Sequence, residues 1–186
     1  MEYKFNNFYE LISFQSNLHK KKTALFVGDE KVSYQQVKEN ADKLAGFLSQ
    51  KGVKEGDRVA LFLRNSAEFI YAIFATSKIG AVLVPVNTFL KEEELSYILK
   101  DSSASVLITS MTYAKVVNHS EASSLCEFIV WEGEEFFPTE REYHFEDILN
   151  TAYDVEQVQR TLEDTAVIFY TSGTTGKPKG AMLSNK

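Results

Sequence analysis

The stretch from Asp57 to Asn87, DRVALFLRNSAEFIYAIFATSKIGAVLVPVN, indicates the fold class. It begins with DRVALFL and ends with AVLVPVN, two apolar runs typical of strands that are buried on both faces. Between the runs, Asn65 and Glu68 mark the start of a capped helix. The apolar residues of this helix lie on several of its sides, so we expect it to be buried: Phe69, Ile70, Ile73, Phe74 and Ile79. Two buried strands joined by a helix predict a parallel pair with a right-handed crossover.

The segments before this unit predict two further helices and a hairpin. Apolar residues at helical spacing indicate an N-terminal helix: Phe8, Leu11, Ile12 and Leu18. The stretch TALFVGDEKVSY then predicts a hairpin that turns at Gly28 and Asp29. Ser33 and Gln36 form a capping-box pattern, and Gly52 can end the following helix with a positive φ.

The alternation continues after Asn87. We expect a helix around residues 92–99, a strand at SVLITS, a weaker helix near 113–118 and a strand at FIVW. Strands that alternate with helices predict an α/β domain whose largely parallel sheet is flanked by helices. The acidic segment EGEEFFPTERE, residues 132–142, indicates a solvated surface excursion rather than a metal site.

Composition narrows the classes of protein. The 186 residues are 44% hydrophobic and 25% charged, as in a soluble globular domain. The net charge of -6 disfavours nucleic acid or an anionic membrane as the main partner. Cys126 is the only cysteine and is expected to be buried rather than nucleophilic, which favours a cytoplasmic location without disulfides. Lys78, Gly80 and Pro85 interrupt the one apolar run of membrane length, and the N-terminus lacks a secretory signal pattern.

A glycine-rich stretch near the end of the chain is the candidate site. It runs YTSGTTGKPKGAMLSNK from Tyr170 to Lys186. The preceding TAVIFY, residues 165–170, predicts a strand, and AMLS can be its returning partner, which leaves Thr171 to Gly180 as a loop. Loops at strand ends are where open α/β sheets place ligands.

The loop has the groups that a polyphosphate needs. Gly173, Gly176 and Gly180 allow backbone N–H groups to approach an anion closely. Hydroxyl donors and positive charge come from the remaining side chains, namely Ser172, Thr174, Thr175, Lys177 and Lys179. A Walker A loop is excluded, because its pattern requires Gly at Thr171 and Ser or Thr at Pro178. A flexible linker of similar composition is the plain alternative.

The histidines and the aromatic residues give weaker evidence of a functional site. His19, His119 and His144 are spread along the chain without metal-ligand spacing. Trp131 and the tyrosines are expected in the core or on strands, because no basic patch accompanies them as in a base-stacking surface.

The stretch YTSGTTGKPKG resembles the phosphate-loop signature of the adenylate-forming, AMP-binding superfamily. This superfamily includes acyl-CoA synthetases, aryl-CoA ligases, luciferases and the adenylation domains of peptide synthetases. Residues 31–109 are also similar to the N-terminal subdomain of the family, whereas residues 1–22 and 125–163 are not distinctive. The resemblance is closest to acyl-CoA synthetases, including long-chain fatty acid:CoA ligases.

The resemblance implies a two-step reaction in a longer parent enzyme. A carboxylate, by default a fatty acid, attacks the α-phosphate of Mg-bound ATP to give acyl-AMP and pyrophosphate. Coenzyme A then accepts the acyl group. ATP, Mg2+ and coenzyme A are thus the implied cofactors, and the residues implied to hold the β- and γ-phosphates are Thr171, Ser172, Gly173, Thr174, Thr175, Gly176, Lys177 and Lys179.

The comparison with the family pattern also concerns Asn185, Asp164 and the end of the chain. Asn185 stands where many members have a histidine, and Asp164 matches the family pattern but is expected to be structural. The resemblance implies that the family's adenine, ribose and metal contacts and its C-terminal domain would lie beyond Lys186. We therefore expect residues 1–186 to be the N-terminal part of the AMP-binding domain, truncated after the phosphate loop at 170–180. Such a fragment is expected to hold no catalytic residue or metal ligand and to be inactive alone; the alternative is a non-catalytic phosphate- or partner-binding module.

Overall fold

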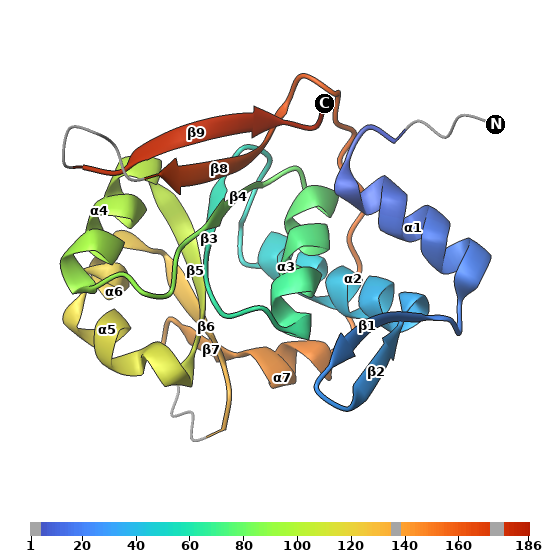
Figure 1. The fold of residues 1–186 in the computed structure, drawn as a ribbon, viewed down its shortest axis with the longest axis horizontal. Coiled ribbons are helices and arrows are strands. Elements are labelled where there is room, and N and C mark those ends of the chain that lie inside the picture. Colours follow the sequence, from blue (N-terminus) through green and yellow to red (C-terminus); the bar gives the residue numbers. More distant parts are fainter. Residues whose placement is uncertain (1–4, 135–138, 172–176) are drawn as a thin grey trace.

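The computed structural model describes residues 5–134, 139–171 and 177–186 (Figure 1). Its main sheet has seven strands in the order β7-β6-β5-β3-β4-β8-β9, and β1 and β2 form a separate hairpin. The strands are β1 Thr23–Val27, β2 Glu30–Ser33, β3 Arg58–Phe62, β4 Val82–Pro85, β5 Ala104–Ser110, β6 Phe128–Glu132, β7 Glu142–His144, β8 Thr165–Thr171 and β9 Lys179–Ser184.

The main sheet is largely parallel. From β7 to β8 each neighbouring pair runs parallel, and β9 returns antiparallel to β8 at one edge. Helices cover both faces (Figure 1). The helices are α1 Phe8–His19, α2 Tyr34–Gln50, α3 Ala67–Lys78, α4 Glu92–Ser102, the 3-10 turn η1 Met111–Tyr113, α5 Ala114–His119, α6 Ala122–Leu125 and α7 Phe145–Leu149. This arrangement confirms the predicted α/β class.

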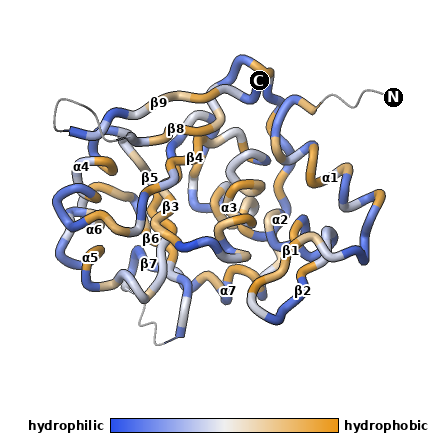
Figure 2. The backbone as a smooth tube through the Cα atoms, viewed as in Figure 1, coloured by the Kyte–Doolittle hydropathy of each residue, from blue (hydrophilic) through white to orange (hydrophobic). Residues whose placement is uncertain are grey.

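Strand β3 separates two hydrophobic clusters. Val59 and Leu61 belong to the cluster under α1, α2, α3 and α7, whereas Ala60 and Phe62 belong to the cluster under α4, α5 and α6. All four side chains have no exposed surface. Figure 2 shows hydrophobic positions concentrated in the central strands and in α3. The apolar run at Asp57 thus marks the centre of the sheet, as the sequence predicts for a strand buried on both faces.

Several predicted boundaries are confirmed in detail. The capping box of Ser33 and Gln36 is present at the start of α2, and Gly52 follows that helix with φ of 95°. The β1–β2 hairpin turns at Gly28, with φ of 58°. The cap of α3 is instead Ser66, one residue after the predicted Asn65, because its side chain accepts a hydrogen bond from the Phe69 N–H. The weak helix predicted near 113–118 begins in the turn η1 and continues as α5.

The buried face of α1 differs from the predicted stripe. Tyr9 and Ile12 are buried, whereas Phe8, Leu11 and Leu18 are exposed. The Tyr9 hydroxyl donates to Asp42 Oδ1 over 2.7 Å, and its backbone N–H donates to Ser77 Oγ. These polar contacts determine which side of the helix faces α2 and α3, and hydrophobic spacing does not reveal them.

Asp42 joins the three helices on this face. It accepts hydrogen bonds from Tyr9 on α1, from Lys38 on its own helix over 2.6 Å and from Lys78 on α3 over 2.9 Å. Burial by itself raises the pKa of Asp42, but the hydrogen bonds from Lys38, Tyr9 and Lys78 outweigh it and hold the pKa below its usual value. Lys78 is buried, and Asp42 is the carboxylate that pairs with its ammonium group.

Replacing Asp42 by Asn is expected to lower the free energy of unfolding at pH 7 by about 1–3 kcal/mol, because charged hydrogen-bond partners lose their acceptor. The ionised carboxylate stabilises the fold above its unfolded pKa near 3.8, and this contribution is lost as pH falls through the lower folded pKa. Urea unfolding should therefore show a difference in the free energy of unfolding between the unaltered protein and the Asn variant, and this difference should narrow as the pH falls below 3.8.

Glu39→Gln is the matched control, because Glu39 is an exposed carboxylate on the same helix that bonds only to Gln35 among the described contacts. Its effect should stay within about 0.5 kcal/mol. An Asp42 variant that is as stable as this control would contradict the role of Asp42.

Candidate functional site

The candidate loop lies at the end of an antiparallel hairpin. Strands β8 and β9 pair as far as Thr171 with Lys179. Thr171, Lys179 and Gly180 were expected in the loop and instead belong to the strands, because the strand pairing continues through them. Of the predicted phosphate-binding residues, the structure therefore places Thr171, Lys177 and Lys179 at the hairpin end. Ser172, Gly173, Thr174, Thr175 and Gly176 lie outside the described residues.

Gly180 is explained by close packing rather than by backbone freedom. A Cβ atom at this position would lie 2.9 Å from the Ile168 side chain and 3.2 Å from the Tyr170 ring. Its φ is not among the positive values of the chain. The backbone freedom predicted for Gly180 is therefore not used there, and the glycine instead leaves space for the ring of Tyr170.

Helix α4 contacts both sides of the candidate loop. Before the loop, the Tyr170 hydroxyl donates to Asp101 Oδ2 over 2.7 Å. At the end of the loop, directly before β9, the Tyr97 hydroxyl donates to the carbonyl oxygen of Pro178 over 3.2 Å, and Lys177 Nζ lies 5.4 Å from the centre of the Tyr97 ring. Desolvation by burial, followed by the hydrogen bond to Asp101, raises the pKa of Tyr170. Tyr170 therefore stays a neutral hydrogen-bond donor.

The two lysines at the hairpin end carry exposed charge. Both Lys177 and Lys179 are exposed, and neither has an ion pair within the part of the chain that the structure describes. Their ammonium groups can therefore bind an anion without first breaking a described salt bridge.

A cavity of about 800 Å³ opens next to the hairpin. Its walls come from the residues that follow β3 and β4, from the end of β8 and from Tyr113. At its edge, Arg64 Nε donates to the Tyr113 hydroxyl over 2.9 Å, which connects the segment after β3 to the segment after β5. The cavity thus lies at the carboxyl ends of neighbouring parallel strands, where open α/β sheets bind ligands. Neither Arg64 nor Tyr113 belongs to a recognisable sequence motif, although both follow closely on buried strands.

An apolar groove lies beside β8 and shares Phe69, Pro85 and Phe169 with the cavity. Its volume is about 700 Å³, and it is lined mainly by Phe8, Phe69, Ile73, Phe169, Met182 and Leu183. Met182 is 67% exposed and Leu183 is 49% exposed. These side chains belong to β9 at the edge of the sheet, so this surface is both apolar and open.

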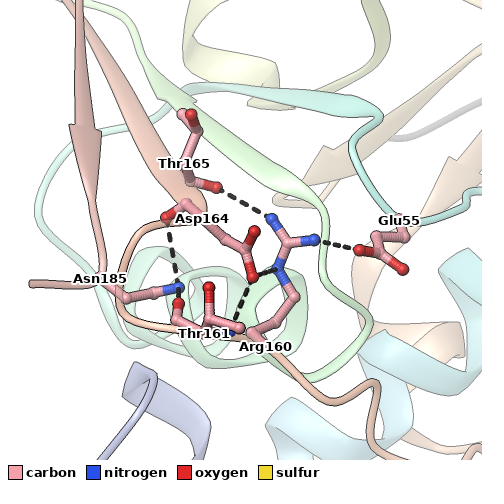
Figure 3. A network of polar contacts seen from close by, with 6 residues as sticks. All are labelled: Glu55, Arg160, Thr161, Asp164, Thr165 and Asn185. Atoms are coloured by element: carbon pink, nitrogen blue, oxygen red, sulfur yellow. Dashed lines mark hydrogen bonds and ion pairs between the residues drawn. The ribbon is translucent and has the colours of Figure 1, made fainter.

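A network of hydrogen bonds and ion pairs lies at the start of β8 (Figure 3). Asp164 Oδ2 accepts a hydrogen bond from the Thr161 backbone N–H over 2.6 Å, and Arg160 pairs with both Asp164 and Glu55. The Asn185 side-chain amide donates to the carbonyl oxygens of Thr161 and Asp164. The predicted structural role of Asp164 is confirmed, and Asn185 fastens the end of β9 to the same turn.

Other sequence candidates are structural. Cys126 is buried, and burial raises the pKa of its thiol to about 12, which confirms the predicted inert role. Trp131 is buried and donates to Glu142 Oε1, as expected for a core residue. Within residues 5–134, 139–171 and 177–186, no cluster of three His, Cys, Asp or Glu could hold a metal ion. No helix in those ranges combines the length and apolar character needed to cross a membrane.

Comparison with known proteins gives consistent results. Residues 13–186 match the model of a family described as AMP-binding enzyme. The chain is 34% identical over 157 residues to crotonobetaine/carnitine--CoA ligase of Salmonella paratyphi C, which covers 82% of this chain and 30% of that protein. It is 35% identical over 160 residues to the long-chain-fatty-acid--CoA ligase FadD13 of Mycobacterium tuberculosis, which covers 85% of this chain and 30% of that protein. The chain thus spans about a third of the length of these curated relatives.

Solved structures agree with the sequence matches. The anthranilate CoA ligase AuaEII in complex with anthranoyl-AMP superposes with a TM-score of 0.88 and 32% identity, over 97% of this chain and 35% of that one. The N-terminal domain of FACL13 from Mycobacterium tuberculosis superposes with a TM-score of 0.82 and 28% identity, over 97% of this chain and 45% of that one.

Replacing Asp101 by Asn is expected to lower the pKa of Tyr170, because the negative charge that disfavours phenolate is removed while burial remains. The pKa should stay above the ordinary value of 10. NMR of ring-labelled tyrosine at rising pH measures this change. Glu93→Gln, an exposed change on the same helix, is the control. A Tyr170 titration that is identical in all three proteins would show that Asp101 does not hold the ring.

Proposed function

The chain belongs to the AMP-binding enzyme family, and we propose that it is the N-terminal part of the AMP-binding domain of a longer, cytoplasmic carboxylic acid:CoA ligase. The observation that carries the proposal is the stretch from Thr171 to Gly180 at the β8–β9 hairpin end. Its sequence combines hydroxyl donors, glycines and two lysines that have no ion pair among the described residues, and the cavity at the carboxyl ends of the strands reaches Tyr170 just before it.

In the proposed reaction, the loop binds the part of ATP that leaves. A carboxylate oxygen of the substrate attacks the α-phosphorus, the bond to the bridging oxygen breaks, and pyrophosphate departs with the electron pair. Mg2+ enters as MgATP, bound to the substrate. Thr171, Lys177 and Lys179 act together with residues 172–176 on the β- and γ-phosphates. Positioned donors and positive charge stabilise the growing charge on the leaving group, which accelerates such transfers.

The second step transfers the acyl group to a thiol. The sulfur of coenzyme A attacks the acyl carbon of the adenylate, AMP leaves, and the thiol proton passes to solvent or base. Pyrophosphate has already left, so the charge of Lys177 contributes to the first step and much less to the second. This difference provides a test of its role.

We propose a fatty acid as the carboxylate. The similarity to FadD13 supports this class, while the similarities to the carnitine and anthranilate ligases keep other acids within the test. A panel of fatty, aromatic and small polar carboxylic acids in an ATP–pyrophosphate exchange assay of the longer protein decides between them. Exchange that depends on a fatty acid supports the proposal. Exchange with another class changes the substrate, and absence of exchange with every acid contradicts the ligase function.

The alternative function is a phosphate- or partner-binding module that needs no further chain. The apolar groove beside β8 bears on this choice, because exposed apolar surfaces of this kind usually contact another part of a protein. The chain spans only about 30% of the length of the CoA ligases that it resembles, and further residues of such a longer chain would cover the groove, so we favour the ligase. An open reading frame that continues past Lys186 would agree with it.

In the longer protein, Lys177→Ala is expected to slow adenylate formation by about 10- to 100-fold, as removal of a transition-state donor does. Thioester formation from supplied acyl-adenylate should change little. Stopped-flow or quenched measurement of the two half-reactions provides the test. Lys115→Ala is the control, since Lys115 is an exposed lysine on α5. An equal loss in both half-reactions would contradict the assigned role.

The 186 residues alone are expected to bind MgATP with a dissociation constant of about 1 mM or weaker and to catalyse no exchange. Exposed charge contributes at most about 1 kcal/mol per pair, whereas fixing the backbone of a glycine-rich segment costs about 1–2 kcal/mol per residue, so little of that cost is offset. Calorimetric or NMR titration measures the binding. Micromolar affinity, or exchange that Lys177→Ala abolishes, would favour the independent module instead.

A further inference from the structure

One face of α4 contacts the chain on both sides of the candidate loop. Tyr97 and Asp101 are four residues apart, so they lie on the same side of the helix. Tyr97 donates to the Pro178 carbonyl oxygen, and Asp101 accepts from the Tyr170 hydroxyl. Figure 1 shows α4 next to the end of the β8–β9 hairpin.

The helix itself is firmly fixed in the core. Leu95, Ile98 and Leu99 of α4 are at most 1% exposed and belong to the cluster on this face of the sheet. Groups that must hold a ligand accurately are best supported by a rigid element packed in this way. Tyr97 and Asp101 are therefore placed to restrain the hairpin end, and no downstream residue is needed for these contacts.

Tyr97 also holds the charge that the proposed function uses. Lys177 Nζ lies 5.4 Å from the centre of its ring, a distance at which the ring attracts a cation. Such an attraction leaves ammonium N–H groups available to an anion. A carboxylate in the same place would compete with phosphate for the charge, and no described carboxylate pairs with Lys177.

We propose that Tyr97 is a positioning residue for the phosphate loop, which holds Lys177 through its ring and Pro178 through its hydroxyl. The proposal rests on the proposed function of Lys177 in binding pyrophosphate. Lys177 and Pro178 are then held on α4 before phosphate binds, so binding costs less entropy at these two residues. Asp101 and Tyr170 provide the corresponding attachment at the entrance.

The two contacts of Tyr97 can be separated by substitution. In the longer protein, Tyr97→Phe keeps the ring and removes the bond to Pro178, whereas Tyr97→Leu removes both. We expect the KM for pyrophosphate in the exchange reaction to rise about threefold in the first variant and about tenfold in the second. The rate of thioester formation from supplied acyl-adenylate should be unchanged, which a general loss of folding would not produce.

Tyr143→Leu is the matched control. Tyr143 also carries a lysine over its ring, Lys51 at 4.2 Å, but it lies on β7 at the opposite edge of the sheet from the hairpin. This variant should lower thermal stability without changing the KM for pyrophosphate. Tyr97→Phe should keep the fold in any case, so the test does not depend on the Leu variant.

A double-mutant cycle tests whether Tyr97 acts through Lys177. In the Lys177→Ala background, the ring has no cation to hold, so Tyr97→Leu should raise the KM no more than Tyr97→Phe does. Full additivity would overturn the ring's role, and unchanged KM in both Tyr97 variants of an active protein would overturn the positioning role as a whole. No exchange in the unaltered protein would instead contradict the proposed function, and the inference with it.

Discussion

Burial of β3 on both faces is the constraint on which the rest of the structure depends. Its four central side chains are fully buried, alternately under the helices of one face and of the other. A strand of this kind needs a neighbour on each side and a helical layer on each face. Strands β4 and β5 fill the neighbouring positions and run parallel to β3. The segments that follow the three strands therefore all begin at the carboxyl ends of the strands, along one edge of the sheet.

That edge brings together segments far apart in the chain. Strand β8 joins β4 in parallel and β9 returns from it, so the hairpin end lies close to α4, the helix that follows β4. The cavity at the same edge is lined by residues from after β3, from after β4 and from β8. The described residues of the hairpin end thus contact α4, and the cavity opens beside Tyr170, which is the arrangement that the proposed nucleotide site needs.

The sequence predicted the parts of the fold that depend on local patterns. Alternating strands and helices, the Ser33 capping box and the buried Cys126 all follow from periodicity and residue type. The side of α1 that is buried did not follow, because Asp42 on another helix selects Tyr9. At the candidate site, the motif predicts Lys177 and Lys179, and it gives no indication of Tyr97 or Arg64. Their roles arise from contacts across 81 and 49 residues of sequence, which no local pattern encodes.

The most direct test of how this protein holds its ligand is a crystal structure of the longer protein with a non-hydrolysable MgATP analogue. The β- and γ-phosphates should lie at the β8–β9 hairpin end, with Lys177 Nζ about 3 Å from a phosphate oxygen and still over the Tyr97 ring. Phosphates bound away from the hairpin, with Lys177 in solvent, would contradict the assignment of this loop.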